Sequence, residues 1–459
     1  MCTANIGQRQ ERPAKISRLL EEISLNSIRE VLPDRIIKES CQAANHTYRN
    51  RILTPIVTVM HMLLAALWPD VSFSAAWQVM WFSLKSNVCD LEVKSPSAGS
   101  LSKARMRLPL AVWRHISDWI CHQAQELSKP LDKWWGLRVV LLDGMCVSMP
   151  ESGSLFEAFG RGKGRCGEYR YPLARLVAMS LANTMTVISY ALEAYHTDET
   201  VLAAGLLETL RKGDILLADR HFAGAHFYVR YQRAGLEFLT RAHQRLKISR
   251  VKRIVTYSEN DFVGRLNIGK TYRRKDPTLP ASIQVRFICS RMLIRGRVRT
   301  VWLVSSLINA DYYPASEIVK LYARRWRIET LFGQLKIELS ARVLRSKSPQ
   351  QIRKEVAARV IALNVVRTIM LTAALDNGID PLRISFVAAV RAIISFAPAM
   401  ATERIFKLPL IYRAMLAEIA ANIVEERPGR NEPRGVVRDP RQYPLLKITR
   451  AQWRKQNAA

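Results

Sequence analysis

Two aspartates stand where their side chains could bind divalent metal ions. Asp143 and Asp219 each follow a short apolar run, Val139–Leu142 and Ile215–Ala218, of the kind that forms strands buried on both faces. An unpaired carboxylate is costly to bury, so each needs a partner, and a cation at the open edge of an α/β sheet can supply one. Magnesium favours a few carboxylates together with water and phosphate oxygens. The alternative is that each aspartate only caps a turn, as the pair Asp143-Gly144 often does.

A third carboxylate, Glu329, lies in a segment with a strong helical pattern. At about 100° per residue, four residues of this segment fall within an arc of roughly 60°: Tyr322, Arg325, Glu329 and Lys336. In this arrangement Glu329 could complete a metal site while its three neighbours contact DNA phosphates. An ordinary exposed helix with i,i+4 ion pairs is the alternative, but it explains the pair Arg325–Glu329 and not the shared arc.

The segment before residue 130 is expected to be helical. The apolar spacing predicts helices at Ile16–Val31, Ile52–Leu67, Ala75–Leu84, Ser100–Arg107 and Leu110–Leu127. Many basic residues lie among them. A compact helical domain with a basic face suits recognition of DNA ends or a dimer contact, and a solvated helical cap is a comparable alternative.

From Arg138 onward strands alternate with helices. Besides the two aspartate-bearing strands, we expect strands at Arg175–Leu181, Thr186–Ala194 and Phe238–Arg241, and helices at about Thr197–Leu210 and Gly224–Ala234. Only strands are expected between about 245 and 310, at Arg253–Tyr257, Ser282–Cys289 and Thr300–Val304, separated by basic loops such as Lys270–Lys275. Helices resume at Pro314–Leu339, Pro349–Leu375, Pro381–Ile394 and Leu410–Val424, and Glu426–Ala459 is expected to be an extended basic arm.

These patterns predict an α/β protein in three parts. The first is a helical N-terminal DNA-binding or accessory domain (1–130). The second is a catalytic domain (131–375) with a β-strand insertion at about 245–310. The third is a helical C-terminal region that carries the basic arm (376–459).

The composition indicates a polyanionic partner. Lysine and arginine total 70 against 39 acidic residues, a formal net charge of +31, for which nucleic acid is the first candidate. A membrane surface is the rival, but the most apolar stretch that we identify, Ile56–Trp68, is short and interrupted, and the N-terminus shows no secretion signal. The seven scattered cysteines contain no CxxC spacing, so we expect neither a zinc site nor a disulfide framework, and a reduced cytoplasm.

The motifs resemble a known family. Tyr322, Arg325, Glu329 and Lys336 reproduce the Y-x2-R-x3-E-x6-K signature of DDE transposases of the insertion-sequence family four. Leu142-Asp143-Gly144 and Ala218-Asp219-Arg220-His221 look like the two catalytic aspartates of that family, although His221 stands where glycine is frequent. Further similar segments extend the resemblance over roughly residues 50–450: Ser346–Glu355, Asn364, Arg367, Arg427–Arg430 and Tyr443–Leu446.

The resemblance implies an RNase H-like catalytic core interrupted by the β insertion, and a transposase that cuts DNA at terminal inverted repeats and joins the ends to target DNA. Asp143, Asp219 and Glu329 would be the catalytic ligands of two Mg²⁺ or Mn²⁺ ions, one activating water and then a 3′-hydroxyl, the other stabilising the leaving oxygen. The implied DNA contacts are Tyr322, Arg325, Lys336, Arg220 and Trp302, of which Trp302 would stack on a flipped base. A core position for Trp302 is equally compatible with the sequence.

The implied partners are double-stranded DNA, as terminal repeats and target, and a second copy in a homodimer on paired ends, in a bacterial cytoplasm near the nucleoid. Two other functions stay open at this point: a catalytically inactive, transposase-derived DNA-binding regulator, and another RNase H-like metal nuclease. A phosphotransferase acting on other substrates is disfavoured, since no GxxxxGK[ST] loop occurs.

Overall fold

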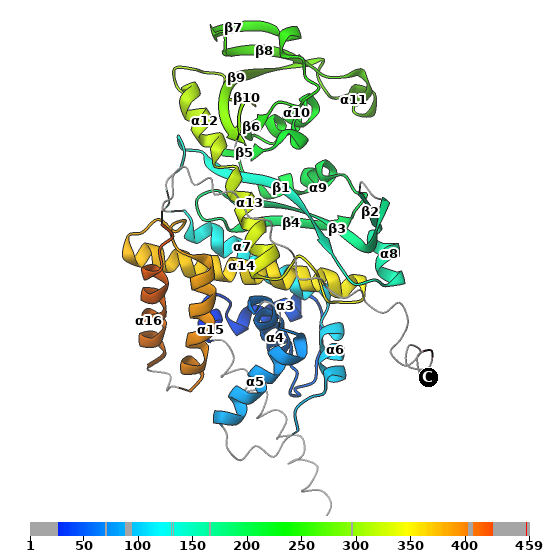
Figure 1. The fold of residues 1–459 in the computed structure, drawn as a ribbon, viewed down its shortest axis with the longest axis vertical. Coiled ribbons are helices and arrows are strands. Elements are labelled where there is room, and N and C mark those ends of the chain that lie inside the picture. The colour runs from blue at the N-terminus through cyan, green and yellow to red at the C-terminus, as the bar shows by residue number, and fades with distance from the viewer. Residues whose placement is uncertain are drawn as a thin grey trace, which may run out of the picture.

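The computed structural model describes residues 26–68, 71–87, 94–129, 131, 133–164, 167–294, 297–402, 407–425 and 456. It has a large mixed sheet on one side and a group of helices on the other, with the long helix α14 (Pro349–Asn377) between them (Figure 1). Most of the predicted helix Ile16–Val31 and the predicted arm Glu426–Ala459 lie outside the described residues.

The N-terminal part is helical, as predicted. Its helices are α2 (Asn26–Arg29), α3 (Asp34–Ala43), α4 (Pro55–Leu67), α5 (Phe73–Asn87), α6 (Ala98–Arg107) and α7 (Leu110–Leu127). Helix α4 begins at Pro55 because Thr54 accepts a hydrogen bond from the Val57 N–H at 3.3 Å, and proline suits the first helical position. Helix α3 was not predicted.

One sheet contains all the described strands of the chain. They are β1 (Arg138–Ser148), β2 (Arg161–Gly164), β3 (Gly167–Leu181), β4 (Val187–Ala194), β5 (Asp214–Ala218), β6 (Glu237–Arg241), β7 (Lys252–Ser258), β8 (Asp261–Asn267), β9 (Ser282–Ile294) and β10 (Arg297–Ser305). The order is β2-β3-β1-β5-β6-β10-β9-β8-β7, and β4 pairs with β3. Strands β1, β5 and β6 are parallel, and β3 and β10 run antiparallel to their neighbours.

Two expectations about the strands need correction. Strand β1 does not end at Asp143 but continues to Ser148, because β3 keeps pairing with it along its whole second half. The strands of the predicted insertion extend the main sheet, since β10 pairs with β6. Strand β8 was missed because Gly264 interrupts its apolar pattern. A Cβ at Gly264 would lie 2.5 Å from the Val251 side chain, so this close approach requires glycine.

The central strand β1 is buried on both faces, as its apolar run predicted. Leu141 packs in the larger core, with α7, α13 (Trp326–Gly333) and α14, while Val140 and Leu142 pack in a second core with α9 (Glu199–Leu206) and α10 (Ala225–Arg233). A short helix α8 (Gly153–Phe159) contacts β3 and β4. Alternate residues of one strand therefore serve two cores, which holds the sheet rigidly between helical layers.

The helices after the sheet differ in detail from the prediction. The expected helix Pro314–Leu339 is divided into α12 (Ala315–Ala323), α13 and a π-helical turn at Gln334–Glu338. The other C-terminal helices are α15 (Phe386–Thr402) and α16 (Leu408–Ala421), and the first begins later than predicted. The predicted loop Lys270–Lys275 is instead a short helix, α11.

Helix α14 is the one described helix that is long and apolar enough to span a membrane, which the expectation based on Ile56–Trp68 did not include. Of its most apolar 18-residue window, 94% is buried inside the protein. It also holds fully buried charges, such as Glu355, whose carboxylate accepts from Arg359 at 2.9 Å. These features are those of a core helix.

Candidate active site

The parallel pairing of β1 and β5 brings the two predicted aspartates together. Leu142 is in register with Ala218, so the next residue of each strand, Asp143 and Asp219, lies at the same level of the sheet. Burial raises the pKa of Asp143 to about 6; the Gly144 N–H lowers it and the charge of Asp219 raises it further. Asp219 is thus close enough for its charge to disfavour ionisation of Asp143.

Glu329 reaches the same region through Arg325. Helix α13 packs on β1, and the Arg325 guanidinium lies between two carboxylates. Its Nη1 is 3.5 Å from Oδ2 of Asp143, and its Nη2 donates to Oε1 of Glu329 at 2.8 Å. The Arg325 side chain is only 9% exposed, whereas that of Glu329 is 54% exposed. Arg325 therefore joins residues 182 positions apart in the sequence and is committed to carboxylates rather than to the surface.

Side chains that could ligate a metal do not yet converge on one point. Within the described ranges, no three histidine, cysteine or acidic side chains are close enough together to hold an ion. At this site the Arg325 guanidinium pairs with both Asp143 and Glu329. The donor atoms present are carboxylate oxygens, the type that Mg²⁺ and Mn²⁺ prefer.

Tyr322 and Lys336 flank this site in ways that a single continuous helix did not predict. Tyr322 is 3% exposed at the end of α12, and burial raises its pKa to about 12, opposed by the charge of Arg325. Lys336 lies in the π-helical turn and is partly buried. Burial raises the pKa of the Cys146 thiol on β1, and Arg175 and Lys336 oppose that shift, which places Lys336 near β1.

The segment after Asp219 forms a capped turn. Oδ1 of Asp219 accepts from the His221 N–H at 2.7 Å at the start of the 3₁₀ turn Arg220–Phe222. Arg220 is exposed. The His221 ring lies 3.6 Å from Asp198 and 3.9 Å from Glu199, so the histidine that departs from the family pattern connects this turn to the start of α9.

A fourth carboxylate, Glu199, was not predicted from the sequence. Its Oε1 accepts from Arg175 Nη1 at 2.5 Å, and its negative charge contributes to the raised pKa of Asp143. The Glu199 carboxylate also occupies the space above Gly144, where a Cβ would meet its Cδ at 2.6 Å. Gly144 is therefore required by tertiary packing. Nothing local in the sequence indicates this contact, because β3 alone brings Arg175 opposite Cys146.

Trp302 lies far along the sheet, in β10, in register with Cys289 of β9. It is partly buried against the second core and meets the Phe262 ring edge-on, with centroids 5.8 Å apart. This packing agrees with the alternative of a core tryptophan. A stacking role on a flipped base stays a prediction.

The cysteines of the described part are free thiols: Cys41, Cys121, Cys146 and Cys289. The first two are buried, and burial raises the pKa of Cys121 to about 12. The remaining three, Cys2, Cys89 and Cys166, lie outside the described residues.

Comparisons with known proteins identify the family. The family described as Transposase DDE domain matches residues 134–365, half of the chain. Transposase InsG for insertion sequence element IS4, from Escherichia coli (strain K12), is 22% identical over 356 residues, which cover 76% of this chain and 78% of that protein. Putative transposase InsZ from the same organism is 30% identical over 92 residues, covering 20% of this chain and 31% of that one. A solved piggyBac transposase synaptic complex with hairpin DNA has a TM-score of 0.43 at 10% identity, over 88% of this chain and 86% of that chain.

The matched segment begins just before β1 and ends within α14, so it contains Asp143, Asp219 and Glu329. The chain belongs to the transposase DDE domain family and is a DDE transposase of the IS4 type.

Proposed function

We propose that this transposase cuts DNA at terminal inverted repeats and joins the freed ends to target DNA, with Asp143, Asp219 and Glu329 as its catalytic carboxylates. The observation that carries the assignment is the register of β1 and β5, together with the Arg325 guanidinium that joins Asp143 to Glu329. In support, Asp219 directly follows the last residue of β5 and Asp143 lies beside it on β1, and ligands of α/β folds bind at the carboxyl ends of parallel strands.

We assign strands β4, β3, β1, β5 and β6 to an RNase H-like core. In support, β4, β3 and β1 are successively antiparallel, while β5 and β6 are parallel to β1. The two aspartates then belong to the adjacent central strands of that core. The strands from β7 to β10 are added at its β6 edge as the insertion before Glu329.

Asp143 and Asp219 fit a divalent cation. Burial, followed by the negative charges of Asp219 and Glu199, raises the pKa of Asp143, so a dication beside it would stabilise the ionised carboxylate. Glu329 is half exposed and can turn away from Arg325 by a side-chain rotation to complete the ligand set. Two Mg²⁺ or Mn²⁺ ions, when bound, would supply Lewis-acid activation of the attacking hydroxyl and stabilisation of the leaving oxygen.

The protein's own residues would then hold the DNA at this site. Arg325, once released from Glu329, presents two N–H groups to a phosphate, and Lys336 and the exposed Arg220 add positive charge. Tyr322 is buried beside Arg325 and would position the Arg325 side chain. The formal net charge of +31 suits a double-stranded DNA partner. We further propose a homodimer on paired ends, in the bacterial cytoplasm near the nucleoid.

Strand cleavage by purified protein tests the proposal. The substrate is a labelled duplex that carries the inverted repeats from the DNA flanking the reading frame, in the presence of Mg²⁺ or Mn²⁺. Asp143→Ala, Asp219→Ala and Glu329→Ala should each abolish cleavage, whereas Asp311→Ala, at an exposed position, should not. If all three single variants still cut, the site assignment is wrong.

A joining assay then separates a transposase reaction from simple nuclease activity. A pre-cut end with a free 3′-hydroxyl should be inserted into plasmid DNA by the wild-type protein. Hydrolysis of the terminal duplex without any joining would contradict the proposed strand transfer.

A further inference from the structure

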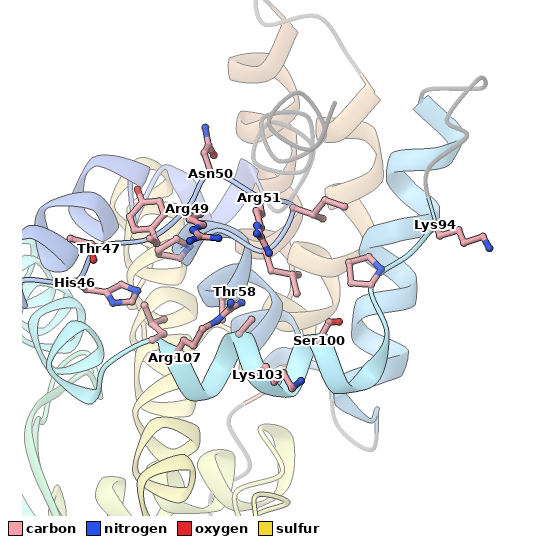
Figure 2. A pocket seen from close by; sticks show the side chains of 17 residues that line it. His46, Thr47, Arg49, Asn50, Arg51, Thr58, Lys94, Ser100, Lys103 and Arg107 are labelled. Atoms are coloured by element: carbon pink, nitrogen blue, oxygen red, sulfur yellow. The ribbon is translucent and has the colours of Figure 1, made fainter. Parts of the chain in front are cut away.

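A wide basic groove lies in the N-terminal helical part, apart from the carboxylates. It has a volume of about 1390 Å³ and runs between the segment 46–53 and helix α6. Figure 2 shows Arg49 and Arg51 on that segment and Lys103 and Arg107 on α6. Lys94, just before α6, is the fifth cation of its lining. We call this the α6 groove.

No described acidic side chain balances the charge of the α6 groove. None of its 17 described lining residues is acidic, and its five cationic side chains are all exposed. In the part of the chain that the structure describes, no ion pair includes any of these five. Five positive charges that share one concavity repel each other, and a polyanion relieves that repulsion.

Hydrogen bonds connect the α6 groove to helix α14. Nζ of the buried Lys354, on α14, donates to the carbonyls of Arg105 and Met106 at 3.0 and 3.1 Å. Gln351, one turn earlier on α14, donates to the same Arg105 carbonyl at 3.2 Å. The last turn of α6, which carries Arg107, is therefore held on the helix that also contacts β4. A ligand in the groove is thereby kept at a set position relative to the carboxylates.

We propose that the α6 groove binds the phosphate backbone of the duplex whose end is cut, at a distance from the scissile bond. This inference rests on the proposed function. Cutting at one defined phosphodiester requires a second contact on the same duplex, at a constant distance from the catalytic carboxylates. The groove offers such a contact, with arginine and lysine side chains that bind phosphates regardless of sequence. The contact accordingly adds affinity and position, while bases are recognised elsewhere.

The test is DNA binding by the full chain with a fluorescent terminal-repeat duplex, as a function of salt concentration. The triple variant Arg49→Ala/Lys103→Ala/Arg107→Ala should bind at least about tenfold more weakly. The slope of log K against log salt should become shallower by about 2.7, since each lost phosphate contact contributes about 0.9. The matched control, Arg391→Ala/Arg413→Ala, changes exposed arginines on α15 and α16 and should bind like the wild type.

The outcomes separate the groove from the proposed function. If the wild-type protein cuts the duplex and the triple variant binds with the same affinity and salt slope as the wild type, DNA binding by the α6 groove is refuted. The catalytic assignment is then unaffected. A wild-type protein that binds through the groove but never cuts would contradict the catalytic assignment alone. Loss of affinity for random target duplex only, with terminal-repeat binding intact, would also overturn the inference.

Folding of the variants is checked by thermal melting with circular dichroism. Should the triple variant melt early, the pair Arg49→Gln/Arg51→Gln, in the segment before α4, provides the same test with a predicted slope change of about 1.8. Both side chains are exposed, so neither substitution removes buried contacts.

Discussion

Replacing Asp143 by asparagine should stabilise the metal-free protein at neutral pH while it removes catalysis. Burial, helped by the charges of Asp219 and Glu199, raises the pKa of Asp143 from 3.8 to about 6. A carboxyl whose pKa is higher in the folded state binds its proton more tightly there. Its ionisation therefore reduces the free energy of unfolding as the pH rises from about 4 to about 6. Asparagine has the same shape and no proton to lose.

The size of the effect follows from the shift. A change of about two pKa units corresponds to about 3 kcal/mol at 1.36 kcal/mol per unit, reached above pH 6 and nearly absent at pH 4. The Asp143 side chain is 20% exposed, so screening by solvent removes only part of it. With an unfolding entropy of about 1 kcal/mol/K for a chain of this length, Asp143→Asn should raise the Tm by about 3 °C at pH 7.5.

The measurement is thermal unfolding with EDTA at pH 4.5 and pH 7.5. The Tm of Asp143→Asn should exceed that of the wild type only at pH 7.5. The Tm of the exposed control Asp311→Asn should equal that of the wild type at both pH values. Adding Mg²⁺ should then stabilise the wild type more than the variant, since the ion needs the ionised carboxylate. Equal Tm values for wild type and Asp143→Asn at pH 7.5 would refute the view that this carboxylate is held in an unfavourable environment.

Three further predictions test one contact of α14 and two contacts of the site. Asn364→Ala should lower the free energy of unfolding by about 3 kcal/mol in urea titrations, because buried Asn364 accepts from the Val187 N–H at 2.8 Å and donates to its carbonyl at 2.7 Å. Gly144→Ala should slow cleavage and lower the Tm, because the added Cβ collides with the Glu199 carboxylate. Glu199→Ala in the same chain should restore the Tm; if the Tm decreases of the two single variants instead add up in the double variant, the two residues do not interact. Arg325→Lys should reduce cleavage by about tenfold or more, because an ammonium cannot present two parallel N–H groups to a phosphate as a guanidinium does, and an unchanged rate would argue against phosphate binding by Arg325.

Local sequence patterns predict much of the catalytic part. The apolar runs before Asp143 and Asp219 require strands that are covered on both sides, and the structure buries them in two cores. The helical spacing around Glu329 and the four-residue signature indicate the family, which the match to residues 134–365 shows. These features are local, since they depend on side chains within one strand or one helix turn.

Features that depend on pairing between distant segments could not be foreseen. Strand β1 continues past Asp143 because β3 pairs with it, and the inserted strands join the main sheet because β10 pairs with β6. The expected helix Pro314–Leu339 is divided at Arg324 and Arg325, although both residues keep helical backbone dihedrals, so the spacing of its side chains is close to the one predicted.

The chemical character of this protein was thus determined by the sequence alone: acidic residues after buried strands, a basic helix signature and a large excess of positive charge. Only the tertiary structure decided which groups face each other. It placed Glu199 over Gly144, closed Arg325 between two carboxylates and brought Arg49 opposite the α6 helix. The physical reason is that burial and ion pairing depend on distances in space, which chain separation does not specify.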